Sequence, residues 1–143
     1  MKVHKLFKLA IILVVLLTIF LGCKEKATKK ENVVSGTIYL ADGNSLENMI
    51  RAIVTIEDIS IADIGSVKVS EVIISPIEEL PIQFSIPYNV TEIRSSRRYS
   101  IRAEVIELNE NGEEERAYLT TRSYPILTGG FGSSVSVLVE RVN

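Results

Sequence analysis

Residues 50–57 read IRAIVTIE, in which every second residue is apolar and three of the four residues between them are polar. The apolar positions are Ile50, Ala52, Val54 and Ile56. Successive side chains of a strand point to opposite faces, so this alternation places one face against a core and the other toward solvent. The run therefore predicts a half-buried β-strand.

The same alternation recurs on both sides of this run. Further strands are predicted at residues 33–40, 67–75, 80–87, 99–105, 113–124 and 135–139. Sequences typical of turns or loops separate them, namely DGNS at 42–45, NENG at 109–112 and GGFG at 129–132. Two prolines in the run 80–87 favour an edge strand, because an edge strand can lack an N–H donor. Only residues 90–96 favour a short helical turn.

About seven short strands in roughly 110 residues, with no helix long enough to cover a sheet, predict an all-β domain. We expect an antiparallel two-sheet β-sandwich of immunoglobulin-like kind. The chain lacks the Cys–Trp–Cys core of antibody domains, so only the general architecture is predicted. Its length of 143 residues is typical of one folded domain.

Residues 1–22 differ in character from the rest of the chain. Lys2, Lys5 and Lys8 give a positive start, and residues 9–21 are apolar apart from Thr18. A positive start, a short apolar run and small residues before a cut are typical of a secretory signal. The apolar run is also shorter than the roughly 20 residues of a membrane-spanning helix. Residues 1–22 are thus predicted to be a signal peptide that is removed.

Residues 20–23 read FLGC and resemble the lipobox of bacterial lipoproteins, with Phe20 where Leu is usual and Gly22 directly before the cysteine. Cys23 is the only cysteine of the chain. We therefore predict that Cys23 is the lipid-bearing first residue of the mature protein, which leaves the folded domain without a thiol. The alternative is an ordinary signal peptide that ends near a free cysteine.

Residues 23–32 are predicted to be the lipidated cysteine and a flexible polar tether, followed by the β-domain at 33–143. The nine tether residues after Cys23 carry four Lys and two Glu. They span about 30 Å when fully extended and about 17 Å on average as a random coil. The lysines could attract anionic lipid heads, or the segment could be a simple polar linker. Lys24 after the cysteine favours the outer membrane, facing the periplasm, in an organism that has one.

The mature chain lacks the side chains on which most enzymes depend. The single histidine, His4, lies in the predicted signal, and Trp is absent. This removes the usual general base, the Ser–His and Cys–His nucleophile pairs and the common zinc sites. Nine basic and sixteen acidic residues in 33–143 disfavour nucleic-acid binding. We predict a protein that is not an enzyme and has no cofactor or metal.

Carboxylate pairs are the remaining route to catalysis, because a glycosidase needs only two acids at a set separation. The candidate pairs are Asp58 with Asp63 and Glu104 with Glu107. Carboxylates in such numbers on a small domain are more typical of solvated surface, and that interpretation is preferred.

Two further features are binding candidates. Asp42, Asn44 and Glu47 could hold calcium loosely, but they lack a full ligand set, which favours an ordinary turn. Phe131 lies between glycines in a loop. It is a candidate partner contact, or it folds back as a plug over the end of the domain, and the sequence leaves both open.

Four stretches in order resemble the YbaY/YscW-type lipoprotein family. They are VTIEDISIAD at 54–63, PIQFSIPY at 81–88, YSIRA at 99–103 and TRSYPILT at 121–128. Where members commonly carry Trp before the Tyr-Pro corner, this chain has Tyr118. The resemblance implies a membrane-anchored β-sandwich without catalytic residues, of a kind in which some relatives are pilotins that help a type III secretin reach and assemble in the outer membrane.

We therefore expect a lipid-anchored, non-enzymatic binding or assembly-assisting module of the cell envelope. Its expected partners are the membrane, through the lipid, and an envelope or secretion-system protein. Strand addition to a sheet edge, or a peptide in a groove, is the natural way to bind such a partner. Envelope polysaccharide binding and a purely structural envelope role are the alternatives.

Overall fold

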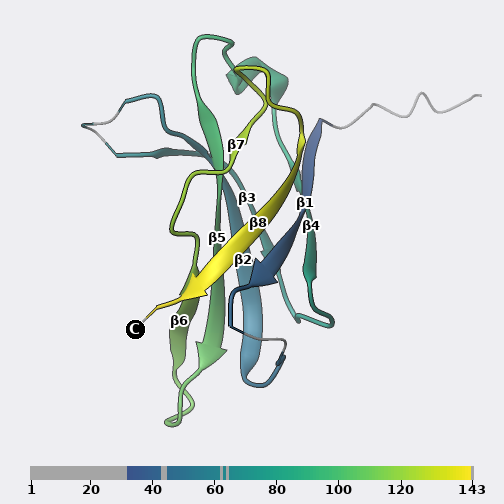
Figure 1. Ribbon diagram of the computed structural model, residues 1–143, viewed down its shortest axis with the longest axis vertical. Coiled ribbons are helices and arrows are strands. Elements are labelled where there is room, and N and C mark those ends of the chain that lie inside the picture. Colours follow the sequence, from purple (N-terminus) through teal and green to yellow (C-terminus); the bar gives the residue numbers. More distant parts are fainter. Residues whose placement is uncertain (1–31, 43–44, 62, 64, 143) are drawn as a thin grey trace, which may run out of the picture. The chain divides into compact units, whose positions relative to one another are not determined.

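The computed structural model describes residues 32–142, apart from residues 43, 44, 62 and 64. This part of the chain forms eight strands and one short 3-10 turn, η1 (Figure 1). The elements are β1 (Val33–Leu40), β2 (Met49–Asp58), β3 (Val67–Ile74), β4 (Ile82–Pro87), η1 (Val90–Glu92), β5 (Tyr99–Leu108), β6 (Glu114–Leu119), β7 (Pro125–Ile126) and β8 (Ser134–Arg141). The all-β prediction is confirmed.

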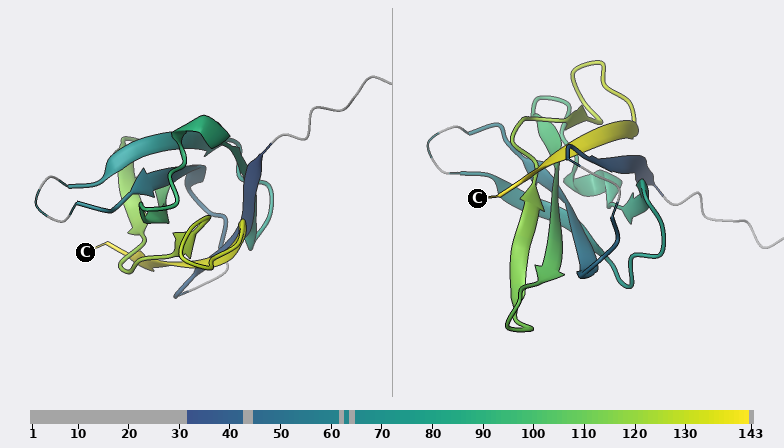
Figure 2. Two further views of the ribbon diagram at one scale, coloured as in Figure 1. Left: turned by 90° about the horizontal axis from the view of Figure 1, so that it is seen from above. Right: turned by 60° about the horizontal axis from the view of Figure 1, so that its bottom comes forward.

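The strands form one mixed sheet that curls into a nearly closed barrel, in the order β3-β2-β5-β6-β8-β1-β4, with β7 paired to β5. Seen from above, the strands make a ring (Figure 2). The predicted two-sheet immunoglobulin-like sandwich is therefore wrong. Period-2 alternation reports which side chains point inward, and a barrel requires the same alternation as a sandwich.

Three pairings close most of the ring. The end of β6 pairs with the end of β8, with Leu119 opposite Glu140. Strand β1 lies between β8, to which it runs parallel, and β4, to which it runs antiparallel. A parallel pair joins strands that are distant in sequence. The sequence therefore has no local signal for the β1–β8 pairing.

The predicted strand at 113–124 is also incorrect in its second half. Strand β6 ends at Leu119, and β7 holds only Pro125–Ile126, beside Tyr99 and Ser100. At the corner, the Tyr124 hydroxyl accepts a hydrogen bond from Leu138 N at 2.8 Å and donates one to Leu138 O at 2.9 Å. These two hydrogen bonds hold Tyr124 against β8, and they end the extended strand that the alternating residues predict.

Inward side chains from all sides of the ring form one core. Val54, Val105 and Val137 are completely buried, as are Ile38 and Ile86. Every second residue of β5 from Tyr99 to Glu107 is buried, as expected for a strand with one face on the core. Burial of apolar side chains is therefore the main contribution to the stability of this part of the chain.

The barrel has two ends with different connections. At the upper end in Figure 1, β1, β3, β5 and β8 begin and β2 and β4 end. Its connections are residues 59–66, 88–98, 120–124 and 127–133. The lower end has the connections 41–48, 75–81 and 109–113. The Tyr88 amide donates to Asn32 O at 2.9 Å, so the described chain starts at the upper end.

Candidate functional site

The ring is open between β3 and β4, and we call this opening the seam. Strand β3 pairs only with β2, and β4 pairs only with β1. The Ser70 hydroxyl donates to Pro87 O at 2.5 Å across the seam, from a side chain rather than from the backbone ladder. The prediction that residues 80–87 form an edge strand is confirmed. Two sheet edges therefore face each other with unpaired backbone groups, the arrangement to which an added strand can bind.

Side chains of β3 that face the core are less covered than their neighbours on β2. Val72 and Ile74 are half-buried, whereas Val54 and Ala52, directly opposite them, are completely buried. The difference arises because β2 has a strand on each side and β3 has one. The seam therefore gives access to the edge of the hydrophobic core.

Strand β3 also presents apolar side chains outward. Val67 is 57% exposed and Ile73 is 56% exposed. An exposed apolar edge strand is an aggregation hazard that monomeric proteins normally avoid with charges or bulges. The same strand carries the exposed charges of Lys68 and Glu71, which lie between these two side chains.

Hollows lie at both ends of the seam. The lower one has a volume of about 170 Å³ and lies between the end of β3 and the start of β4. It is lined by Ile74, Pro76, Ile77, Glu78, Glu79, Ile82 and Gln83. The upper one has a volume of about 370 Å³ and lies between the start of β3 and η1. It is lined by Asp58, Val67, Lys68, Val69, Thr91, Glu92, Arg94 and Arg97.

Asp58 anchors the wall of the upper hollow. It is 8% exposed, and its Oδ2 accepts a hydrogen bond from Arg97 Nη1 at 2.7 Å. Its Oδ1 accepts from the backbone and hydroxyl of Ser60, at 3.0 and 2.6 Å. Burial by itself would raise the pKa of Asp58, but the hydrogen bonds from Ser60 and Arg97 outweigh it and hold this pKa below its usual range.

Asp58→Asn should lower the free energy of unfolding by about 1.5 kcal/mol, because a charge-assisted contact to the partly exposed Arg97 is lost. A carboxyl whose pKa is lowered by folding stabilises the fold above its unfolded pKa, and this contribution disappears as the pH falls through the folded value. The difference between the two proteins should therefore be constant near neutral pH and shrink below about pH 4. Urea unfolding at several pH values measures it.

Asp63→Asn is the matched control for that measurement, since Asp63 is exposed in the connection that follows Asp58. We expect a change of less than about 0.5 kcal/mol at every pH. A difference between Asp58→Asn and the native protein that persisted unchanged at pH 2 would contradict the assignment.

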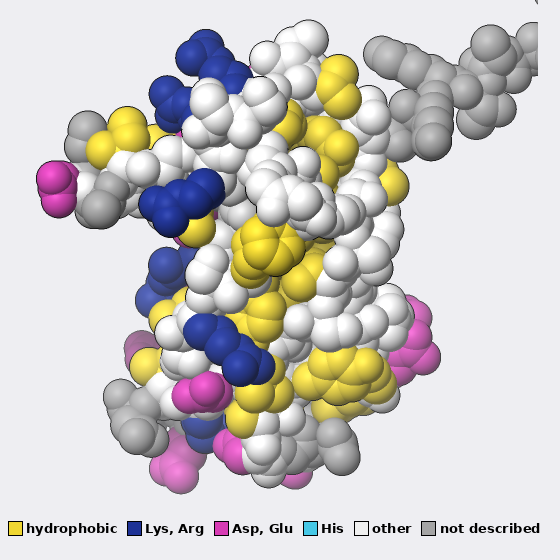
Figure 3. Space-filling view, turned by 45° about the horizontal axis from the view of Figure 1, so that its top comes forward, with side chains coloured by type: hydrophobic (Ala, Val, Ile, Leu, Met, Phe, Trp, Pro, Cys, Tyr) yellow, Lys and Arg dark blue, Asp and Glu magenta, His cyan; other side chains and the backbone are white. Residues whose placement is uncertain are grey.

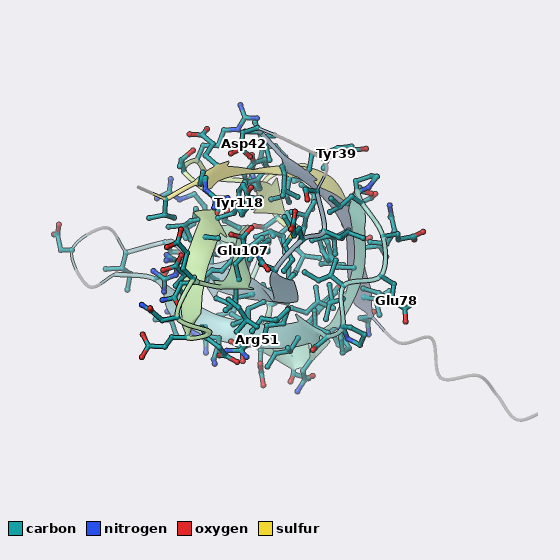
Figure 4. All side chains as sticks on the ribbon, turned by 90° about the horizontal axis from the view of Figure 1, so that it is seen from below. Tyr39, Asp42, Arg51, Glu78, Glu107 and Tyr118 are labelled. Atoms are coloured by element: carbon teal, nitrogen blue, oxygen red, sulfur yellow. The ribbon has the colours of Figure 1, made fainter. Side chains whose placement is uncertain are left out.

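A second polar cluster lies at the lower mouth of the barrel. Arg141 Nη2 donates to Glu107 at 3.1 Å, and Arg141 Nη1 donates to the Tyr118 hydroxyl at 2.8 Å. Figure 4, seen from below, places Glu107 and Tyr118 on the inner side of the ring. Burial raises the pKa of Tyr118, against the opposing effect of Arg141. These groups satisfy one another, as buried polar groups must, so the cluster serves the fold.

The candidate catalytic pairs do not form a catalytic site. Asp58 is held by Arg97, while Asp63 is exposed. Glu104 and Glu107 are an odd number of residues apart on β5 and point to opposite faces of the sheet. Glu104 binds Arg102 and Arg116, at 3.0 and 2.7 Å, on the outer face.

The other sequence candidates are placed as follows. Asn44 and Cys23 lie outside the described residues, so the lipid anchor stays a prediction. In the described ranges, no cluster of His, Cys, Asp or Glu has the geometry of a metal site. Phe131 is 52% exposed in the connection 127–133, so it does not fold back as a fully buried plug. Polysaccharide binding would favour exposed aromatic side chains, and of the tyrosines Tyr99, Tyr118 and Tyr124 are buried while Tyr39 is 46% exposed.

The sequence contains no local signal for the seam. The prolines of 80–87 indicated one edge strand, but nothing in the sequence indicated that β3 lies opposite it.

The departure from the family pattern at Tyr118 is accommodated in the core, where its ring also lies 5.1 Å from the Arg141 guanidinium. Among residues 32–142, as far as the structure describes them, no helix has the length and apolar character to cross a bilayer.

Comparison with known proteins adds two findings. The sequence profile of a family described as type III secretion system lipoprotein chaperone (YscW) matches residues 29–139. A solved structure of an alternative pilotin from the type II secretion system of Vibrio cholerae superimposes with a TM-score of 0.69 at 20% identity, over 80% of this chain and 99% of that one. Among curated protein sequences, none matches this chain significantly.

Proposed function

Because this chain belongs to the YscW family of type III secretion system lipoprotein chaperones, we propose that it is a lipid-anchored pilotin-like chaperone whose seam binds a segment of its partner. The family supports a non-enzymatic role in the cell envelope. The partner that best fits is a secretin-like channel protein of a secretion system. The lipid at Cys23 would hold the complex at the outer membrane, facing the periplasm.

The open seam is the observation that supports this proposal. A chaperone for a membrane channel must hold an apolar segment until the segment reaches its place in the assembly. The seam offers unpaired backbone groups on β3 and β4, the exposed apolar side chains of Val67 and Ile73, and a partly apolar hollow beside Ile77. Strands β3 and β4 touch where Ser70 donates to Pro87 O, so the two edges would have to separate to admit an extended segment. The segment would then pair with the free edge by main-chain hydrogen bonds, with its alternate side chains directed at the core edge.

A photo-crosslinking amino acid at Ile73 of the intact lipoprotein should form an adduct with one channel protein in living cells. The same probe at Glu115 should form little or none, because β6 lies opposite the seam in the strand order. A third probe, at Phe131, tests the candidate partner contact of the upper loop. Mass spectrometry of the adducts identifies the partner and the segment.

Ile73→Glu should reduce the adduct formed by a probe at Val67 several-fold, since a carboxylate on the seam must be desolvated when an apolar segment covers it. Glu115→Lys is the control, with an exposed charge changed on the opposite strand. Equal adducts from the Ile73 and Glu115 probes would show that the seam is not the binding site.

A further inference from the structure

The two ends of the barrel differ in charge. The upper connections contain Arg94, Arg97, Arg98 and Arg122 but only two acids, Asp63 and Glu92. The lower connections contain no basic residue and six carboxylates, at Asp42, Glu47, Glu78, Glu79, Glu110 and Glu113. Figure 3, with the upper end turned forward, shows basic side chains from the top down the left side, and acidic ones at the left and right edges and along the bottom. The domain is acidic in total, but the connections at its upper end carry a net positive charge and those at its lower end only negative charge.

Three of these arginines form no ion pair with any described residue, namely Arg94, Arg98 and Arg122, whereas Arg97 is paired with Asp58. Arg122 donates to the Tyr124 hydroxyl at 2.9 Å, which leaves Arg94 and Arg98. Arg98 donates to Ile59 O at 3.4 Å, which leaves its charge unneutralised, and both side chains are exposed. Arg94 also lines the upper hollow, whose volume of about 370 Å³ leaves room for a phosphate group.

Apolar side chains accompany these charges. Three different upper connections each present one exposed apolar residue, at Ile61, Val90 and Phe131. Exposed apolar residues also occur near the lower end, but there they lie among carboxylates that anionic lipid would repel. Arginines interleaved with apolar loop tips are typical of surfaces that rest on the interface of a membrane.

The position of the chain start indicates which ligand the upper end binds. The fold begins at Asn32 on the upper end, so the segment that joins it to Cys23 is covalently attached there. That segment is itself basic, with four Lys and two Glu in residues 24–32. A lipid at Cys23 would place the upper end within about 30 Å of the headgroups at most. The charges that favour anionic lipid are thus on the end that the anchor would keep near it.

We propose that the upper end of the barrel is a membrane-binding surface, with Arg94 and Arg98 on anionic phospholipid headgroups and Ile61, Val90 and Phe131 at the interface. The inference rests on the anchoring part of the proposed function. In this orientation the carboxylate-rich lower end points away from the membrane, and the seam runs between the two ends, accessible from the side.

Single cysteines test this orientation, because a lipidated Cys23 leaves the chain without a free thiol. The lipidated full-length mature protein is placed in vesicles with a fluorophore on Ser96→Cys, in an upper connection, or on Asn111→Cys, in a lower one. Headgroup nitroxide lipids then quench whichever fluorophore lies at the surface. In vesicles containing phosphatidylglycerol, we expect strong quenching at residue 96 and little at 111. In phosphatidylcholine alone, or in 1 M salt with a screening length of about 3 Å, the two should converge.

The substitutions Arg94→Glu and Arg98→Glu reverse the charge at these positions. Each should lower the ratio of barrels that rest on the membrane to barrels held only by the lipid by about fivefold or more. Reversing Arg51 and Arg116, which changes net charge equally but near the lower end, should leave quenching at residue 96 as it was. Quenching at residue 96 that ignored lipid charge and the Arg94/Arg98 reversal would overturn the proposal. Failure of the anchor itself has a separate signature, since the native protein would then react with the thiol dye and would not float with vesicles.

Discussion

Replacing Cys23 with Ser should abolish lipid labelling of the protein and release it from the membrane fraction. A diacylglyceryl anchor gains about 0.8 kcal/mol for each buried CH₂ group, so its loss changes the partition by many orders of magnitude. The tether lysines and upper arginines alone would hold the domain only weakly and in a salt-dependent manner. Metabolic labelling with a fatty-acid analogue and membrane fractionation measure the two effects.

Thr28→Cys in the Cys23→Ser background is the control for a chemically reactive thiol. It places one cysteine in the same polar segment but away from the predicted cut, and it should not acquire lipid. The folded domain should retain its thermal unfolding temperature in both variants, because the substituted positions precede the β-domain predicted at 33–143. Lipid labelling or membrane retention that survived Cys23→Ser would favour the alternative of an ordinary signal peptide followed by a free cysteine.

Gly36→Ala should destabilise the barrel by about 3 kcal/mol or more, the upper end of the range for overpacking a core. A Cβ at this position would lie 2.2 Å from Val135 O and 2.6 Å from the Phe84 ring. The first contact is to backbone of the parallel partner strand and cannot be relieved by a rotamer change. Only hydrogen fits where β1 passes between β8 and β4. Thermal unfolding should shift downward by about 10 °C or more.

Ser35→Ala, at the neighbouring exposed position of β1, is the matched control and should change stability by less than about 0.5 kcal/mol. Adding Phe84→Leu to Gly36→Ala removes the contact with the ring but not the one with Val135 O. The double variant should therefore recover only part of the loss that Gly36→Ala causes, apart from the cost of Phe84→Leu alone. An unfolding temperature of Gly36→Ala equal to that of the native protein would mean that β1 does not pack between β8 and β4 this closely.

The strands could be predicted because their signal is local. Residues 50–57 alternate as β2 requires, and Asn-Gly at 111–112 predicts the β5–β6 turn, where Gly112 has φ of 77°. The second half of the predicted strand at 113–124 failed for a non-local reason. Its β-branched residues favour extended structure, but the bonds between the Tyr124 hydroxyl and Leu138 turn the chain.

The candidate site shows the same division. The sequence identified Asp58 only as a candidate carboxylate, directly after the alternating run 50–57, and its bonds to Ser60, two residues away, are local. Its ion pair with Arg97 joins residues 39 positions apart and has no local signal. Likewise, the prolines indicated that β4 is an edge, while the edge opposite it depends on how far the ring closes.

By itself, the sequence determined the all-β class, which side chains face the core, and the lack of histidine and thiol chemistry after Cys23. These features depend on composition and on the alternation of side chains with a period of two residues, and both can be read from short stretches of sequence. Only the tertiary structure decided that the strands form one ring instead of two sheets, and that β1 runs parallel to β8. It alone left β3 and β4 each with one unpaired edge and gave the connections at the two ends opposite net charges. Those features depend on contacts between residues far apart in the chain, whose free energies no local pattern records.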